Sequence, residues 1–585
     1  MKKIIFTALI FITGMSVLTG CTSWIEEDPD SLVTDGMIEG SDDPDASAKL
    51  LVTGVYSKWI NDMFRWGYFP RVLEQDADYI SGPDWLFGTF GTGNFQGEPE
   101  VIDALWNGCY NLIERANKAE RDLRSMRGAT EDVKDNAIGE VKFHKAFAYF
   151  LLVRAFGPVP IQPETELKGH DQPRRSVAEV YDYIIKNLEE GATLMYKNTE
   201  SGYEAGHVNA GSAAGLLAKV YATMASAAMP AGTRVTVRTG PAYSGSGEDK
   251  AYAPLVSMTF GKDAVSGYEE MNPEELYTKA SEWAWAVIKG DYGHYELLPY
   301  DELWKKESRT ASEFMFSVAS ADGNETYSTQ VHTQYDGYRT APGSDFIASG
   351  GWTGCTRHWY DLFDHDDYRI TKGVKHRWRV YTQEQGNSGF YYPYTDEYSI
   401  AATGYDLNGS WVADPVEPYN DGVSYYYSMD SQCLAFTTKY SDVTNNATEN
   451  ADSNWPFLRY ADVMLIYAEA ENELNHIGTA LDYLNYVRQR SNANAASLTG
   501  NGALDTKDKM RSAIIEERAK EFACEADRRW DLLRWGIYLD AMNALGGSDD
   551  SNISKSRQER NLLFPIPNSE INTNGSINEN NPGWN

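Results

Sequence analysis

The segment 140–160, EVKFHKAFAYFLLVRAFGPVP, decides which class of fold this chain adopts. Its apolar and aromatic side chains recur every three or four residues, which is the spacing of one face of an α-helix. The residues that carry this pattern are His144, Phe147, Ala148, Leu151, Leu152 and Ala155. The pattern ends at the Gly157-Pro158 pair, a typical helix stop. The sequence therefore predicts an amphipathic helix over residues 140–156.

The same spacing recurs towards both ends of the chain. Val463, Ile466, Tyr467 and Ala470 repeat it, and further helices are predicted around 46–62, 101–123, 177–195, 209–228, 273–289, 480–490 and 507–523. Many of these segments contain small residues, which let neighbouring helices approach closely and stack as pairs. We therefore predict a mainly α fold of tetratricopeptide-like helix pairs, although no strict repeat of about 34 residues is visible.

Between residues 231 and 454 the composition changes. Gly, Ser, Thr, Asp and Tyr dominate, and short strand-like pieces such as 314–318 replace most of the helical pattern. The segments on either side show the same helical pattern, and neither ends in an obvious linker. We therefore predict a single domain over 46–585, with a helical scaffold at about 46–230 and 455–545 and a long irregular excursion of loops and short strands at 231–454.

Composition excludes several classes of protein. The chain has 585 residues, with 52 basic and 85 acidic side chains and a formal charge of −33. Such a charge repels phosphate backbones, so nucleic acid is a poor candidate partner. The mean hydropathy of −0.50, with no apolar run of about eighteen residues after the N-terminus, excludes a multi-span membrane protein.

The N-terminus has the pattern of a bacterial lipoprotein signal. Lys2 and Lys3 precede an apolar stretch at 4–18, and Leu18-Thr19-Gly20-Cys21 forms a small-residue site that ends in cysteine. We predict a signal peptide at 1–20, lipidation of Cys21, and an acidic tether at 21–45 that spaces the body from the membrane. The alternative is an uncleaved signal anchor.

The other cysteines form no recognisable motif. They lie far apart and contain no C-x-x-C pair, so neither a zinc cluster nor a dense disulfide framework is indicated. We expect buried thiols at Cys109, Cys355, Cys433 and Cys524.

Five sequence blocks resemble the SusD/RagB family. They are VKFHKAFAYF at 141–150 with RAFGPVP at 154–160, LRYADVML at 458–465, LNYVRQR at 484–490, IEER at 515–518 with RWDL at 529–532, and FPIP at 564–567 with NPG at 581–583. Their order and spacing fit the family over nearly the whole mature chain. One departure is Ala526, where the family often has glycine.

The resemblance implies a glycan-binding lipoprotein of the outer membrane. It would face the cell exterior and deliver oligosaccharides to a SusC-type TonB-dependent transporter. The acidic cluster Glu26-Glu27-Asp28 is similar to the export signal of surface lipoproteins in Bacteroidetes, although a plain solvated linker fits equally well. The resemblance implies no catalysis, so we expect no catalytic residues and no cofactor. The alternatives are a peptide-binding or docking solenoid of the RagB type and, less favoured, a glycoside hydrolase.

The candidate catalytic and metal-binding groups have simpler interpretations. Glu517 and Glu521 are the neatest carboxylate pair, but their spacing of one helical turn in a basic-rich segment favours salt bridges. A metal site could be built from histidines and aspartates of one polar region, yet the spacing matches no compact motif, so we expect no metal and interpret them as solvated loop residues. These residues are His358, His365, His376, Asp364, Asp366 and Asp367.

A sugar site needs exposed aromatic rings for the apolar face of a pyranose and fixed polar groups for its hydroxyls. Residues 65–94 are rich in both, and glycines interrupt regular structure there. We select Trp66, Asp78, Trp85 and Asn94, with Trp85 as the first choice for a stacking platform. The alternative for a single loop tryptophan is burial in the core.

The excursion supplies a second group of aromatic residues around the Gly350-Gly351 turn. We select Tyr335 and Trp352 from it, with Trp352 preferred. Because the whole chain is acidic, we expect the ligand to be a neutral oligosaccharide rather than a polyanionic glycan.

Overall fold

The computed structural model describes residues 42–64, 68–165, 171–241, 243–244, 251–323, 326–336, 352–380, 388–392, 404–405, 411–412, 424–426, 434–445, 448–546 and 556–584. The predicted signal peptide, most of the tether, Cys21 and Trp66 lie outside these residues. Within the described part of the chain, no helix is both long and apolar enough to cross a bilayer.

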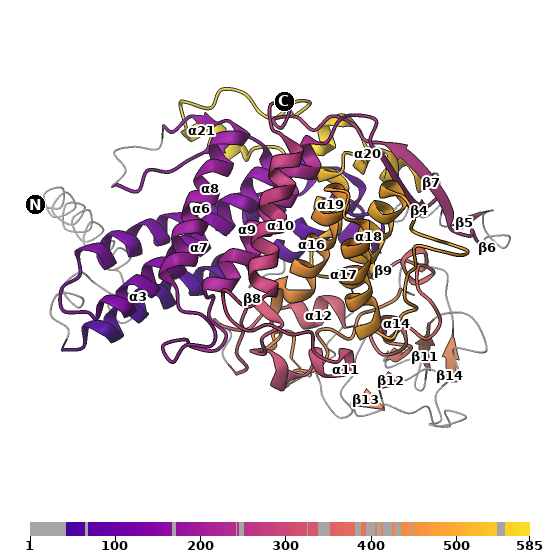
Figure 1. Cartoon of the computed structure of the whole chain (residues 1–585), viewed down its shortest axis with the longest axis horizontal. Helices are drawn as coiled ribbons and strands as arrows, with labels where there is room; N and C mark the ends of the chain where they lie inside the picture. The colour runs from indigo at the N-terminus through magenta and orange to yellow at the C-terminus, as the bar shows by residue number, and fades with distance from the viewer. Residues whose placement is uncertain are drawn as a thin grey trace, which may run out of the picture.

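Long helices form the body of the molecule. They are α3 Pro44–Lys58, α6 Pro99–Ser125, α7 Glu131–Phe156, α8 Val177–Leu194, α9 Ala210–Ala228, α10 Pro273–Ile288, α16 Tyr460–Glu473, α17 Ile477–Arg490 and α18 Lys507–Glu521. Consecutive helices pack against each other from α6 to α10, and α10 then packs against α16, which packs against α17 and α18 (Figure 1). The fold is the predicted mainly α array of helix pairs.

The close contact between α7 and α8 depends on small residues. Gly139 of α7 faces Met195, and a Cβ on Gly191 of α8 would lie only 3.2 Å from the carbonyl oxygen of Gly139. Helix α8 starts with a capping box between Ser176 and Glu179, which satisfies free backbone groups of its first turn. The cap lies directly before the predicted start at 177, and the helix ends at Leu194, one residue before the predicted end at 195.

Shorter helices connect and cover the long ones. They are the π-helix Trp59–Phe64, α4 Tyr68–Glu74, α5 Asp84–Phe87, α11 Tyr300–Leu303, α12 Val331–Tyr335, α13 Arg357–Tyr360, α14 Tyr368–Thr371, α19 Arg528–Arg534, α20 Tyr538–Ala544 and α21 Asn568–Thr573. Short 3-10 turns lie at Phe90–Thr92, Phe95–Gly97, Lys306–Ser308 and Glu559–Leu562.

The strands form small separate sheets rather than one large sheet. The antiparallel pairs are β1 Ile80–Ser81 with β9 Gly354–Cys355, β2 Val159–Pro160 with β3 Arg174–Arg175, β4 Arg234–Thr239 with β7 Val256–Gly261, β5 Tyr243–Ser244 with β6 Ala251–Tyr252, β8 Phe314–Val318 with β15 Trp455–Arg459, and β12 Gly404–Tyr405 with β13 Trp411–Val412. In the remaining sheet, β11 Ser388–Tyr391 pairs antiparallel with β10 Arg377–Val380 and parallel with β14 Ser424–Tyr426. Figure 1 places most of these strands beside the helical body.

Ion pairs buried in the interior tie the excursion to the helical scaffold. Arg459, at the end of β15, contacts Glu313 at 2.8 Å, Glu521 at 3.0 Å and Glu525 at 2.7 Å. All four side chains are almost completely buried. Because a buried charge is costly unless it is paired, this network fixes the segment before β8 against the end of α18.

Candidate ligand-binding site

Two tryptophans that are far apart in the sequence meet on one surface. The ring centroids of Trp85 and Trp352 lie 5.4 Å apart, and the ring planes make an angle of 80°. Trp85 is 64% exposed, and Trp352 is half-buried against the core. These are the two residues that the sequence favoured as stacking platforms. We call the pair the tryptophan platform.

The β1–β9 pair brings the two tryptophans together. Ser81 pairs with Gly354, so the chain leaves β1 towards Trp85 beside the point where it enters β9 after Trp352. The backbone amide of Trp352 also donates to the carbonyl of Gln334 at 2.9 Å. Gly82 lies so close to the backbone of Trp352 that a Cβ added to Gly82 would be 2.1 Å from the carbonyl oxygen of Trp352. Only glycine fits at this approach of two backbones.

The short helix α5 presents Trp85 outward while its neighbours pack inward. Leu86 and Phe87 are buried, and their amides both donate to the carbonyl of Pro83, at 3.0 and 2.9 Å. Arg71 of α4 donates to the carbonyl of Leu86 at 3.4 Å and forms an ion pair with Glu98. The exposed ring of Trp85 therefore lies on a backbone segment that these hydrogen bonds fix in place.

Arg71 was not selected from the sequence. Its side chain is largely buried, and its Nε has no hydrogen-bond partner among the described residues. The signal available in the sequence was its place within the aromatic segment 65–94, but nothing there indicated a bond to the residue after Trp85. We interpret Arg71 as the group that positions α5.

Two selected residues do not face solvent, and the sequence-based assignment is corrected for both. The carboxylate of Asp78 is buried and accepts two hydrogen bonds from Arg528, at 2.8 and 2.7 Å. Tyr335 is 1% exposed and packs against Tyr440 and Trp455, with ring centroids 5.4 and 5.6 Å away. Asp78 is engaged in an ion pair, and Tyr335 is part of the aromatic core. We therefore leave both residues out of the proposed ligand contacts.

The last two selected residues stay predictions. Asn94 is exposed between the 3-10 turns Phe90–Thr92 and Phe95–Gly97, and its carbonyl accepts from the amide of Gly97 at 3.0 Å. Its side chain is therefore on the surface, on the segment that follows α5. Trp66 lies outside the described residues.

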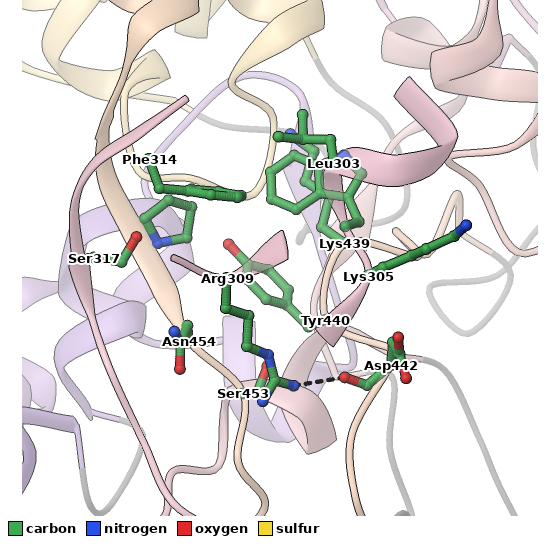
Figure 2. Close-up of a pocket in the computed structure, with 12 residues that line it drawn as sticks. Leu303, Lys305, Arg309, Phe314, Ser317, Lys439, Tyr440, Asp442, Ser453 and Asn454 are labelled. Carbon is green, nitrogen blue, oxygen red and sulfur yellow. Dashed lines mark hydrogen bonds between the residues drawn. The ribbon is translucent and has the colours of Figure 1, made fainter. Parts of the chain in front are cut away.

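A different hollow in the excursion is too small for a sugar (Figure 2). It lies between α11, β8 and the segment around Tyr440, and its volume is about 30 Å³, room for one or two water molecules. Two of the basic side chains around it have partners: Arg309 donates to the carbonyl of Asp442 at 2.6 Å, and Lys439 donates to the carbonyl of Glu521 at 2.8 Å. The tryptophan platform is therefore a better candidate than this hollow.

Comparison with known proteins assigns the chain to a family. The model of the SusD family matches residues 312–584, and a second model, described as starch-binding associating with outer membrane, matches residues 92–222. The chain belongs to the SusD family. It is 24% identical to SusD-like protein P2 of Formosa agariphila over the full length of both chains.

Solved structures of SusD relatives have the same fold. A SusD homolog from Bacteroides thetaiotaomicron matches with a TM-score of 0.69 at 20% identity, covering 94% of this chain and 99% of that one. Surface glycan-binding protein A from Bacteroides fluxus matches with a TM-score of 0.60 at 17% identity, covering 92% and 99%.

Ala526, the residue that departs from the family pattern, has an unusual backbone conformation. Ala526 has a φ of 66°, in the left-handed region where a side chain is disfavoured. Its amide donates to the buried carboxylate of Glu74 at 2.9 Å, which fixes the backbone in this conformation. The glycine that is common in the SusD family would adopt it without strain.

The carboxylates most similar to a hydrolase pair are locked in ion pairs. Glu517 contacts Arg369 at 2.5 Å and Arg488 at 2.9 Å, and Glu521 lies 3.0 Å from Arg459. Burial raises the pKa of both carboxyls, but the surrounding arginines outweigh it and lower both values. A general acid for glycoside hydrolysis needs a raised pKa, so this pair has the wrong protonation state.

The histidines selected as a possible metal site do not come together. His358 is buried 3.3 Å from the carbonyl of Ala253, and both ring nitrogens of buried His376 lie 2.8 Å from backbone carbonyls. Of the three histidines only His365 is exposed, and Asp367 is buried in an ion pair with Arg369. Interpreting the group as solvated loop residues was therefore wrong for His358, His376 and Asp367. The residues that the structure describes contain no group of three or more acidic, histidine or cysteine side chains suited to a metal ion.

Proposed function

We propose that this SusD-family chain is a cell-surface lipoprotein that captures neutral oligosaccharides on the tryptophan platform. The observation that supports the proposal most is the pairing of exposed Trp85 with Trp352 on a hydrogen-bonded backbone. The two rings are nearly perpendicular, so they offer an L-shaped apolar surface that can contact both a face and an edge of a pyranose. The similarity to a surface glycan-binding protein supports the same ligand class.

The charge of the chain favours a neutral ligand. A net charge of −33 creates a long-range repulsion against uronates and sulfated sugars. We therefore expect binding of a neutral glycan that is nearly independent of salt. Tight binding of a polyanionic glycan that weakens with added salt would contradict this part of the proposal and leave the glycan class intact.

Calorimetry on the purified mature chain tests the proposal. The titrants are starch, β-glucan, xylan and mannan oligosaccharides, with pectin and sulfated glycans as the anionic arm. We expect one class of neutral glycan to bind, without release of reducing sugar over hours of incubation. Reducing-sugar release that a Glu517→Gln variant abolishes would instead support a hydrolase.

We propose that Cys21 is lipidated and holds the chain on the outer membrane, facing the cell exterior, beside a SusC-type TonB-dependent transporter. The family resemblance and the match to a model described as associating with outer membrane support this assignment. Affinity purification of the full chain from its own cells, after mild detergent extraction, tests the partner. We expect a large TonB-dependent barrel protein in stoichiometric amount. Recovery of the chain alone after cross-linking would contradict the partnership.

One observation favours the alternative of a peptide-binding or docking solenoid. Trp285 of α10 is 42% exposed and stacks on Tyr467 of α16, and exposed Tyr486 of α17 extends the aromatic group. Helix faces of this kind commonly contact proteins or peptides. Calorimetry with peptide mixtures tests this function. Peptide binding that Trp285→Ala weakens and Trp85→Ala leaves unchanged would favour it over glycan capture.

A further inference from the structure

Two cysteines lie in contact, and one of them belongs to the strand that follows Trp352. The sulfur atoms of Cys355 and Cys524 are 3.8 Å apart, although 169 positions separate the residues in the sequence. Cys355 ends β9, the strand that follows Trp352, and Cys524 lies in the turn between α18 and α19. Both side chains are buried, at 1% and 0% exposure.

The backbone around each cysteine is held in place. The amide and carbonyl of Cys355 exchange hydrogen bonds of 3.0 and 2.9 Å with Ala435, and Cys355 also pairs with Ile80 of β1. The carbonyl of Cys524 accepts from the hydroxyl of Tyr440 at 2.5 Å. A disulfide has a sulfur separation of about 2.05 Å, so the two sulfurs need to approach by less than about 2 Å.

We propose that Cys355 and Cys524 form an intramolecular disulfide in the exported protein. The bond forms by exchange with a disulfide donor, either a thiol–disulfide oxidoreductase or a small-molecule disulfide. One cysteine attacks the donor as a thiolate and forms a mixed disulfide, and the second displaces the donor thiol. The chain loses two protons and two electrons, and the donor disulfide becomes two thiols.

Burial of the two thiols determines when during folding the disulfide can form. The contact with Cys355 and the burial of the site raise the pKa of the Cys524 thiol, so the native pair contains little of the reactive thiolate. The exchange therefore takes place while both segments are still accessible during folding, and the native contact selects this pair. Once closed, the bond is shielded from reductants by the same packing.

The disulfide would fix the support of the tryptophan platform. It joins the strand after Trp352 to the end of α18, where Glu521 and Glu525 pair with Arg459. The closed loop runs over 169 positions and contains the C-terminal part of the excursion, from residue 355 to residue 454. Cross-linking so long a loop removes much conformational entropy from the unfolded chain and raises the melting temperature.

Peptide mapping of the full mature chain tests the proposal without any substitution. The protein is isolated from the membrane fraction of its own cells, trapped with an alkylating reagent under denaturing conditions, and digested without reduction. A second sample is denatured, reduced and refolded in glutathione redox buffer, which makes the test independent of the proposed export. We expect a linked Cys355–Cys524 peptide in both samples, with buried Cys109 alkylated as the internal control.

Melting curves provide the second readout. We expect the oxidised protein to melt about 2 to 5 °C above the reduced protein. Cys355→Ser should abolish this difference, whereas Cys109→Ser, at an equally buried thiol outside the pair, should preserve it. Alkylation of both Cys355 and Cys524 in both samples, or a linked peptide with a different partner, would overturn the proposal.

Discussion

Replacing Trp85 by alanine should weaken glycan binding and leave the fold intact. Trp85 is 64% exposed, so only about a third of its surface is buried in the free protein. A buried tryptophan covers roughly 200 Å² or slightly more, so the change removes about 70–80 Å² of contact and costs at most about 2 kcal/mol of stability. Loss of a stacking surface should cost about 1–3 kcal/mol of binding free energy, roughly a 5- to 150-fold loss of affinity.

Two tryptophans elsewhere in the chain make matched controls. Trp285 is 42% exposed on the helical scaffold, so Trp285→Ala should leave glycan affinity unchanged. Trp59 is buried and donates to His144 at 3.1 Å, so Trp59→Ala should cost about 3–5 kcal/mol of stability while the folded fraction binds normally. Calorimetry and melting curves on the same preparations separate these outcomes.

A double-mutant cycle tests whether the platform acts as a unit. Because Trp85 and Trp352 touch edge to face, their substitutions should be non-additive by about 0.5–1.5 kcal/mol of binding free energy. The reasoning is refuted if Trp85→Ala and Trp352→Ala each bind the wild-type ligand within about twofold of the wild-type affinity, which is less than about 0.4 kcal/mol.

Three further predictions follow from particular residues. Cys21→Ala should release the chain from membranes in cells that lack the transporter, and continued membrane fractionation would contradict the lipid anchor. Ala526→Gly should stabilise the fold by about 1 kcal/mol in denaturant titrations, because it relieves a φ of 66°; a less stable variant would show that this conformation is not strained. Burial lowers the pKa of His207, but its 2.8 Å bond to Glu140 outweighs burial and raises the pKa. The melting advantage of wild type over His207→Gln should therefore be complete below about pH 6.5 and decline as pH rises through the raised pKa, whereas an advantage that grows with pH would refute this.

The sequence predicted the helical scaffold well because the helix signals are local. Apolar spacing and the Gly157-Pro158 stop located the end of α7, and the helix predicted at 177–195 agrees with α8. The start of α7 was missed, since its first turns, from Glu131, are mostly polar and carry only a weak apolar pattern. Boundaries that depend on exposed residues have little pattern to reveal them.

The candidate site was only partly predictable because its parts come from distant segments. Residue type and nearby glycines were enough to select Trp85 and Trp352 separately, but their contact depends on the pairing of β1 with β9. Asp78 sits in the same polar segment as Trp85, yet its fate is decided by Arg528, 450 positions away. No local pattern distinguishes a carboxylate that faces a ligand from one that faces a distant arginine.

The position of a bound oligosaccharide tests the central claim most directly. A crystal structure of the mature chain with the glycan identified by calorimetry would locate it. We predict a sugar ring within about 4 Å of the Trp85 indole, with Trp352 against its edge. An oligosaccharide bound at full occupancy elsewhere, with the tryptophan platform in open solvent, would contradict the account.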